Sequence, residues 1–188
     1  MKKVLLLTLG IALFVGASTS AVDMTGKYGL GFWTAESAVG GRYWINEKVG
    51  FDLGIGFTME DCTLMDENGE PKDETAKTIA FDAGLLYVVF PSDRANFFIR
   101  PGIMYKMHDD EVYVDPQQGM ETKFETESWF MVSATLGAEL FFGDNFSLSA
   151  GHGLYFNTYS PAGDGDSETT IGTFGHSITN FGFTFYFK

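Results

Sequence analysis

The stretch that decides the fold is Val49-Gly50-Phe51-Asp52-Leu53-Gly54-Ile55-Gly56-Phe57. Every second residue in it is a large apolar side chain, and the residues between them are glycines and one aspartate. Successive side chains of a β-strand point to opposite faces, so this alternation predicts a strand with one apolar face and one small or polar face. The segment is long enough to cross a bilayer as a tilted strand, which takes about 9–11 residues.

The same alternation recurs along the chain. The chain is rich in glycine and aromatic residues and has only 5 prolines, a mixture that favours strands and turns over helices. No apolar run after residue 21 has the length of about 20 residues that a membrane-spanning helix needs. We therefore predict an all-β protein of eight strands, at residues 27–33, 38–45, 49–59, 76–90, 96–107, 128–141, 146–158 and 177–187.

The connections between these strands fall into two groups. Residues 46–48, 91–95 and 142–145 form short turns, whereas residues 60–75, 108–127 and 159–170 form long polar loops; residues 34–37 are a short exception. Short turns at one end and long loops at the other are typical of outer-membrane barrels. The predicted fold is an eight-stranded antiparallel up-and-down transmembrane β-barrel. The alternative is a soluble, periplasmic, lipocalin-like binder, which gives no reason for sorting the loops.

The beginning of the chain predicts the compartment. Met1-Lys2-Lys3 is followed by an apolar run over residues 4–16 and then by small residues that end at Ala21. A basic start, a short apolar run and small residues at a cleavage point indicate a secretory signal peptide. We expect residues 1–21 to be the signal peptide and residues 22–188 the barrel domain. The protein would lie in the outer membrane, with both termini in the periplasm and the long loops outside the cell.

Two segments resemble a known family. The run from Gly40 to Phe51, GGRYWINEKVGF, is similar to the second strand, turn and third strand of the small outer-membrane barrels that include the transmembrane domain of outer membrane protein A and the outer membrane protein X group. The alternating aromatics from Phe181 to Phe187 resemble their closing strand. The resemblance implies that the outer-membrane assembly machinery reads this strand, and that outer-membrane lipids surround the barrel.

The inward face of the predicted barrel carries charges of both signs. By strand parity these are Lys27, Arg42, Asp52, Asp82, Arg100, Lys106 and Glu139. Eight strands enclose a space just wide enough to be filled by side chains, and a buried charge is costly unless it is paired. We therefore predict a network of Arg42, Asp52, Asp82, Arg100 and Glu139 that blocks the bore; the alternative is a narrow pore. Pro101 lacks an amide proton, so we expect a bulge or kink there.

The three long loops are acidic. They contain seventeen acidic residues and two lysines, a balance of −15, whereas the whole chain has a net charge of −13. Nucleic acid is an unsuitable partner because no basic patch meets its phosphates. Asp164, Asp166 and Glu168 loosely resemble the start of a calcium loop, but the twelve-residue pattern is incomplete, and we expect neither metal nor cofactor. Within residues 108–127, Val112-Tyr113-Val114 and Thr122-Lys123-Phe124 flank a turn that contains Pro116. This pattern predicts that the fifth and sixth strands continue as a protruding hairpin, a candidate surface for an extracellular partner.

An enzyme of lipids is a further alternative, because some small outer-membrane barrels modify lipids. A serine hydrolase needs a base beside its nucleophile. His152 has the parity of the lipid face, where barrels that deacylate lipid A carry a His-x-Ser pair, but the residue two positions on is Leu154. His176 and Ser177 are adjacent and so face opposite ways, and His108 opens an acidic loop without a nucleophile. We expect no catalytic residues and a structural, interaction or adhesion role.

Overall fold

The computed structural model describes residues 22–32, 38–66, 68, 70–114, 121–163, 165–173 and 179–188. The predicted signal peptide and the 34–37 connection lie outside the described residues, as do the tip of the predicted hairpin, Asp164 and His176. In the described part no helix is long and apolar enough to span a membrane.

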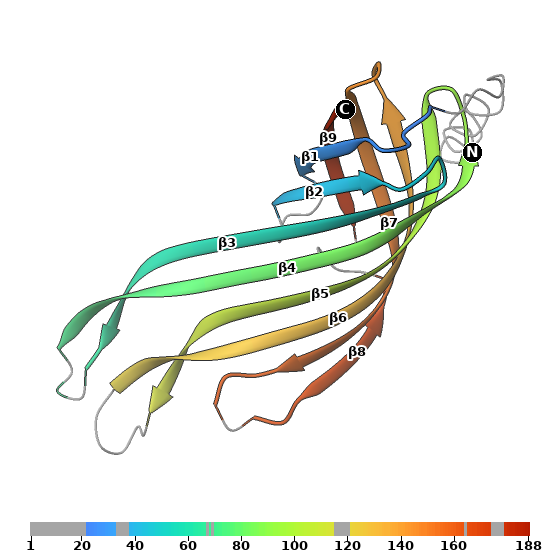
Figure 1. Ribbon diagram of the computed structural model, residues 1–188. Helices are drawn as coiled ribbons and strands as arrows, with labels where there is room; N and C mark the ends of the chain where they lie inside the picture. The colour runs from blue at the N-terminus through green and yellow to red at the C-terminus, as the bar shows by residue number, and fades with distance from the viewer. Residues whose placement is uncertain are drawn as a thin grey trace, which may run out of the picture.

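The described chain is a single antiparallel sheet that closes into a barrel (Figure 1). Each of β1 to β7 pairs with the next, β7 also pairs with β9, and β9 pairs with β1, so the ring is complete. The strands are β1 (Tyr28–Phe32), β2 (Val39–Trp44), β3 (Val49–Met65), β4 (Pro71–Pro91), β5 (Ala95–Val114), β6 (Glu121–Phe141), β7 (Phe146–Ser160), β8 (Glu168–Gly172) and β9 (Asn180–Phe187).

The last position in the ring is shared by two strands. The first part of β7, from Phe146 to Gly151, pairs with β9, and its last part, from Tyr155 to Tyr159, pairs with β8. β8 and β9 are therefore two pieces of one wall element, and the barrel has the eight positions that the alternation predicted. The predicted eight-stranded antiparallel barrel is confirmed in this respect.

Much of the chain that was predicted to be loop is strand. β3 and β4 remain in register up to the pair Met65–Pro71, and β5 and β6 up to Val114–Glu121. The prediction of long loops over residues 60–75 and 108–127 was wrong in this respect, because continued pairing satisfies backbone groups that a loop leaves to water. The predicted continuation of the fifth and sixth strands as a hairpin is confirmed up to the edge of the described residues. β3 to β6 thus project as long ribbons beyond β1, β2 and β9 (Figure 1).

The bulge expected at Pro101 is not there. Gly84–Gly102 and Tyr87–Ile99 keep one register between β4 and β5 on both sides of the proline, and Pro101 itself stays opposite Ala134 of β6. The shift of register lies on β4 instead, between Val88 and Phe90. The β4–β5 ladder is therefore interrupted opposite Pro101 and Arg100, as a missing amide proton implies, but the register and the strand parity continue past Pro101.

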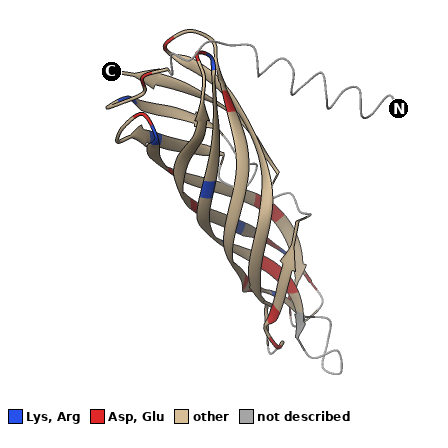
Figure 2. Cartoon of the chain, turned by 90° about the vertical axis from the view of Figure 1, so that its right-hand side faces the viewer, with Lys and Arg blue, Asp and Glu red and all other residues tan. Residues whose placement is uncertain are grey.

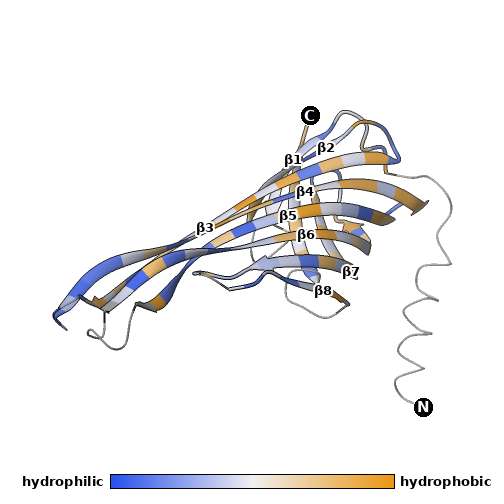
Figure 3. Ribbon diagram, turned by 90° about the horizontal axis from the view of Figure 1, so that it is seen from below, coloured by the Kyte–Doolittle hydropathy of each residue, from blue (hydrophilic) through white to orange (hydrophobic). Residues whose placement is uncertain are grey.

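The outer surface of the barrel is apolar. Side chains such as Leu53, Phe81, Leu136 and Phe183 are exposed on it. On each strand, the residues that alternate with these outward side chains face inward. Hydrophobic residues form much of the barrel wall, and the projecting ends of β3 to β6 are mainly hydrophilic (Figure 3). The C-terminus lies at the other end, with the short turns (Figure 1). An apolar outer wall with polar ends is the arrangement that a bilayer requires.

Candidate functional site

A layer of buried charges crosses the middle of the barrel. Arg42 of β2 and Asp52 of β3 are register partners, and Arg42 Nη2 lies 3.0 Å from Asp52 Oδ2. Arg100 of β5 donates to the same carboxylate, with Nη2 at 2.7 Å and Nε at 2.9 Å from Asp52 Oδ1. Arg100 also pairs with Asp82 of β4. One aspartate therefore holds two arginines, and the chain of contacts crosses four strands.

Glu139 of β6 extends this layer on the other side. Its Oε1 lies 3.1 Å from Arg42 Nη1, in an ion pair without hydrogen-bond geometry. The same oxygen accepts hydrogen bonds from Ser147 Oγ at 2.5 Å and from Tyr186 Oη at 2.6 Å. The structure thus brings together all five residues of the predicted network, and each of them is buried. Such pairing and hydrogen bonding are what a buried charge requires.

Glycines make the room for Arg100. Gly84 and Gly102 are register partners beside it, and a Cβ built on Gly84 would collide with the Arg100 guanidinium. A Cβ on Gly102 would lie 2.7 Å from Arg100 Nη1. The guanidinium therefore lies flat against a bare stretch of wall. The glycines on the inward face were a usable signal for this close approach.

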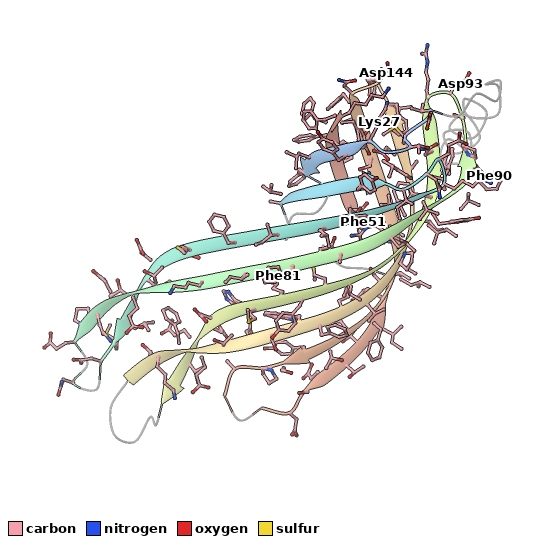
Figure 4. All side chains as sticks on the ribbon, in the orientation of Figure 1. Lys27, Phe51, Phe81, Phe90, Asp93 and Asp144 are labelled. Carbon is pink, nitrogen blue, oxygen red and sulfur yellow. The ribbon has the colours of Figure 1, made fainter. Side chains whose placement is uncertain are left out.

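Lys27 and Lys106 do not join this layer. Lys27 lies at the end with the short turns, near Asp93 and Asp144 (Figure 4), where its Nζ donates to the Asp144 carbonyl at 3.1 Å. Lys106 faces inward above the charge layer, with Nζ 4.8 Å from the centre of the Trp129 ring. Strand parity therefore predicted the side of the barrel wall on which each lysine lies, but it could not predict the group that each lysine contacts.

An apolar plug lies between the charge layer and the end of the barrel with the short turns, and the sequence analysis missed it. Buried side chains fill the end of the bore near the short turns, and Val22 packs against them; they are Met24, Trp44, Leu86, Val88, Phe98, Phe141 and Tyr186. Trp44 Nε1 donates to Tyr186 Oη at 3.3 Å, and Tyr186 in turn reaches Glu139. The plug and the charge layer thus form one continuous filling. The aromatics at Trp44, Phe98 and Tyr186 have inward parity, which was the available signal.

An aromatic pair lines the inside of the barrel above the charge layer. Trp129 of β6 stacks on Tyr159 of β7 with ring centres 5.1 Å apart, and Tyr159 Oη donates to Glu127 at 2.6 Å. That hydrogen bond raises the pKa of the Tyr159 phenol to about 12, since ionisation would leave two anions in contact. Phe156 is the last large apolar residue of β7 on the outer face, and Tyr159 follows it. Tyr159 therefore lies outside the apolar part of the barrel wall.

The projecting ribbons carry much of the acidic charge (Figure 2). Threonines hydrogen-bond to some of it: Thr63 and Thr75 donate to Asp73 and Asp61 across the β3–β4 ribbon, at 3.1 and 3.0 Å. Of the candidate calcium ligands, Asp164 lies outside the described residues, Asp166 is exposed, and Glu168 begins β8. Among the described residues no three His, Cys, Asp or Glu side chains form a group that could hold a metal ion.

The two described histidines contact threonines. His152 Nδ1 lies 2.9 Å from Thr179 Oγ1 on the outer face, and His108 Nδ1 lies 2.7 Å from Thr78 Oγ1 inside the barrel. Neither contact supplies the third group that orients the base of a hydrolytic triad. His176 lies outside the described residues.

Comparison with known proteins finds similarity among solved structures only. No family model matches the chain, and no curated protein matches it. Among solved structures it is similar to the N-terminal β-barrel domain of Pseudomonas aeruginosa OprF (14% identity, 87% of this chain and 98% of that chain, TM-score 0.42). It is also similar to a major outer membrane protein of Thermus thermophilus (15%, 86% and 99%, 0.45) and to the attachment invasion locus protein of Yersinia pestis (13%, 87% and 100%, 0.38).

Proposed function

We propose that this chain is a non-enzymatic outer-membrane barrel whose bore is closed and whose acidic ribbons form an interaction surface outside the cell. Residues 1–21 would be removed on export, both termini would lie in the periplasm, and the strand from Phe181 to Phe187 would be the segment read by the assembly machinery. The role is structural or adhesive.

The observation that carries the proposal is the filling of the bore. A layer of paired charges lies directly above an apolar plug, and the two are joined through Tyr186. Water and ions crossing the barrel would have to break several charge-assisted hydrogen bonds and displace close-packed aromatics at the same time. The filled interior therefore favours a closed, structural barrel and argues against a conducting pore.

The ribbons support the interaction role. β3 to β6 hold their pairing well beyond the apolar wall and present rows of polar and acidic side chains. A paired ribbon is more rigid than a loose loop. Binding a partner there would therefore cost less conformational entropy, because the ribbon is already ordered. The strong negative charge favours a basic partner. The described residues of the predicted partner surface, 108–114 and 121–127, lie on the projecting parts of β5 and β6.

Single-channel recording of the refolded chain in planar bilayers tests the closed bore. We expect no steady conductance from the unsubstituted chain, because the charge layer and the plug seal it in series. The alternative is a narrow pore. A regular, ion-selective conductance that Arg100→Ala alters, with little loss of stability in that variant, would reject the closed bore and establish the pore.

A further inference from the structure

The apolar outer wall is not uniformly filled. A groove of about 470 Å³ lies on it across β2 to β6, and its lining is almost entirely apolar. Two rows of outward side chains form its walls. One row is Val39, Ile55, Phe81, Tyr105 and Phe130; the other is Gly41, Leu53, Ala83 and Ile103.

Small residues open this hollow. Between the two rows lie Gly40, Gly54, Asp82 and Met104, whose positions alternate with the outward ones, so their backbone forms the floor. Gly41 and Ala83 leave gaps in the second row, and a Cβ placed on Gly41 would meet only the Gly29 carbonyl oxygen, at 3.9 Å. Phe81, labelled on β4 in Figure 4, forms part of the opposite wall.

We infer that this groove binds one hydrocarbon chain of a membrane lipid, held more firmly than the lipid around the rest of the barrel. The inference rests on the proposed membrane location. The volume is that of a site for one small organic ligand, about 300–1,000 Å³. The Tyr105 hydroxyl is the single polar side-chain group among the outward residues of the lining. This suits a hydrocarbon chain, because a single hydroxyl group offers too few hydrogen bonds to hold a peptide or a sugar.

The physical reason lies in packing. Lipid chains are as apolar as leucine, so the hydrophobic effect does not favour one site on the wall over another. A hollow, however, surrounds a chain with protein atoms on several sides, and each contact adds dispersion energy that a smooth wall does not supply. An empty groove would forfeit those contacts for its own walls as well. The groove is continuous with the exposed apolar surface, so a chain enters it from the bilayer.

Fluorescence quenching by a lipid with brominated acyl chains tests this. The folded chain in detergent carries Tyr105→Trp in the groove wall, or Leu136→Trp on an exposed part of the apolar wall outside the groove as the matched control. We expect the Tyr105→Trp signal to saturate at one lipid per barrel, with half-quenching at an about tenfold lower lipid-to-detergent ratio than the control, equivalent to about 1.4 kcal/mol.

Ala83→Phe fills the groove and should return Tyr105→Trp to the behaviour of the control. Ala134→Phe adds the same bulk to the outer face of β6 outside the groove and should leave the saturable quenching unchanged. Circular dichroism identifies any variant that fails to fold. Equal quenching of the two tryptophans, or saturable quenching that survives Ala83→Phe in a folded barrel, would overturn the inference. Either outcome leaves the membrane location intact, whereas a chain that stays monomeric in buffer without detergent would refute that location.

Discussion

At the scale of the residue, the centre of this molecule is Asp52. Its carboxylate accepts hydrogen bonds from both Arg42 and Arg100 and is fully buried. Each arginine also contacts a second acid, Glu139 or Asp82. Removing one arginine therefore takes a charged partner from two buried acids in a space that water reaches poorly, and such losses usually exceed what the ion pair itself contributes.

Arg100→Ala should lower the free energy of unfolding by about 3–5 kcal/mol, because it removes the buried cation that pairs with both Asp52 and Asp82. Urea titration of the refolded barrel in lipid vesicles measures the loss. The control is Lys123→Ala, which removes a half-exposed cation paired with Glu125 on the β5–β6 ribbon. An exposed pair contributes about 0–1 kcal/mol. Equal losses in the two variants would show that the interior is wet.

Gly84→Ala tests how closely Arg100 lies against the wall. The new methyl group would collide with a guanidinium held by two aspartates, and we expect a loss of about 1–3 kcal/mol, as for other overpacked sites. Gly41→Ala is the control, because its Cβ has room. The two unfolding midpoints, compared in the same lipid, decide the matter, and a Gly84→Ala barrel as stable as Gly41→Ala would contradict the placement of Arg100.

Tyr159 gives a prediction for pH. Its pKa of about 12 in the folded chain is above the ordinary value of 10.0, chiefly because Glu127 accepts its hydrogen bond. The contribution of this hydrogen bond is therefore complete below pH 10 and is lost as the pH rises from 10 to about 12. Glu127→Gln should bring the pKa of Tyr159 down, as read from its ring resonances by NMR. A tyrosine that titrates identically in both proteins would refute the contact.

At the scale of the element, each long strand from β3 to β6 combines a membrane-facing half and a projecting half. On β3 the outward side chains are apolar from Val49 to Met59 and polar at Asp61 and Thr63. The same backbone ladder with β4 runs through both halves without a break. In the proposed membrane location, the strand would therefore pass from lipid to water by a change of side chains alone, and backbone pairing supports the projecting ribbon.

Leu53→Arg should destabilise the barrel by about 2–4 kcal/mol, since it places a cation on the outer wall at mid-strand in contact with lipid. Thr63→Arg on the same face of the same strand should have little effect, because it lies beyond the apolar segment. Unfolding in lipid vesicles compares the two. Equal losses of stability in Leu53→Arg and Thr63→Arg would show that the apolar segment of β3 is not the part that contacts the membrane.

At the scale of the whole molecule, the two ends of the barrel differ. One end carries the short turns, both ends of the described chain and the apolar plug; the other carries the ribbons and the aromatic pair (Figure 1). The interior is therefore sealed at one end and polar toward the other. In the proposed orientation, the sealed end would lie in the periplasm and the acidic ribbons would lie outside the cell.

The orientation can be tested on intact cells. In a Cys62→Ser background, Asp73→Cys on the β3–β4 ribbon should react with a membrane-impermeant maleimide, whereas Asp93→Cys in the β4–β5 turn should react only after the outer membrane is permeabilised. The reason is that the assembly of such barrels leaves short turns in the periplasm. Labelling at position 93 but not at position 73 would reverse the proposed orientation.

The sequence by itself determined which residues face outward and which face inward, because side chains alternate along a strand and the apolar set marks the outer face. It therefore predicted the eight-membered barrel, and it placed Arg42, Asp52, Asp82, Arg100 and Glu139 on the inward face. It could not determine their partners, which come from strands brought together only by closure of the ring. Arg100 and Asp52 are 48 residues apart, and Trp44 and Tyr186 are 142 apart. The apolar plug and the groove on the outer wall were likewise decided by tertiary structure, because each is a space bounded by several strands.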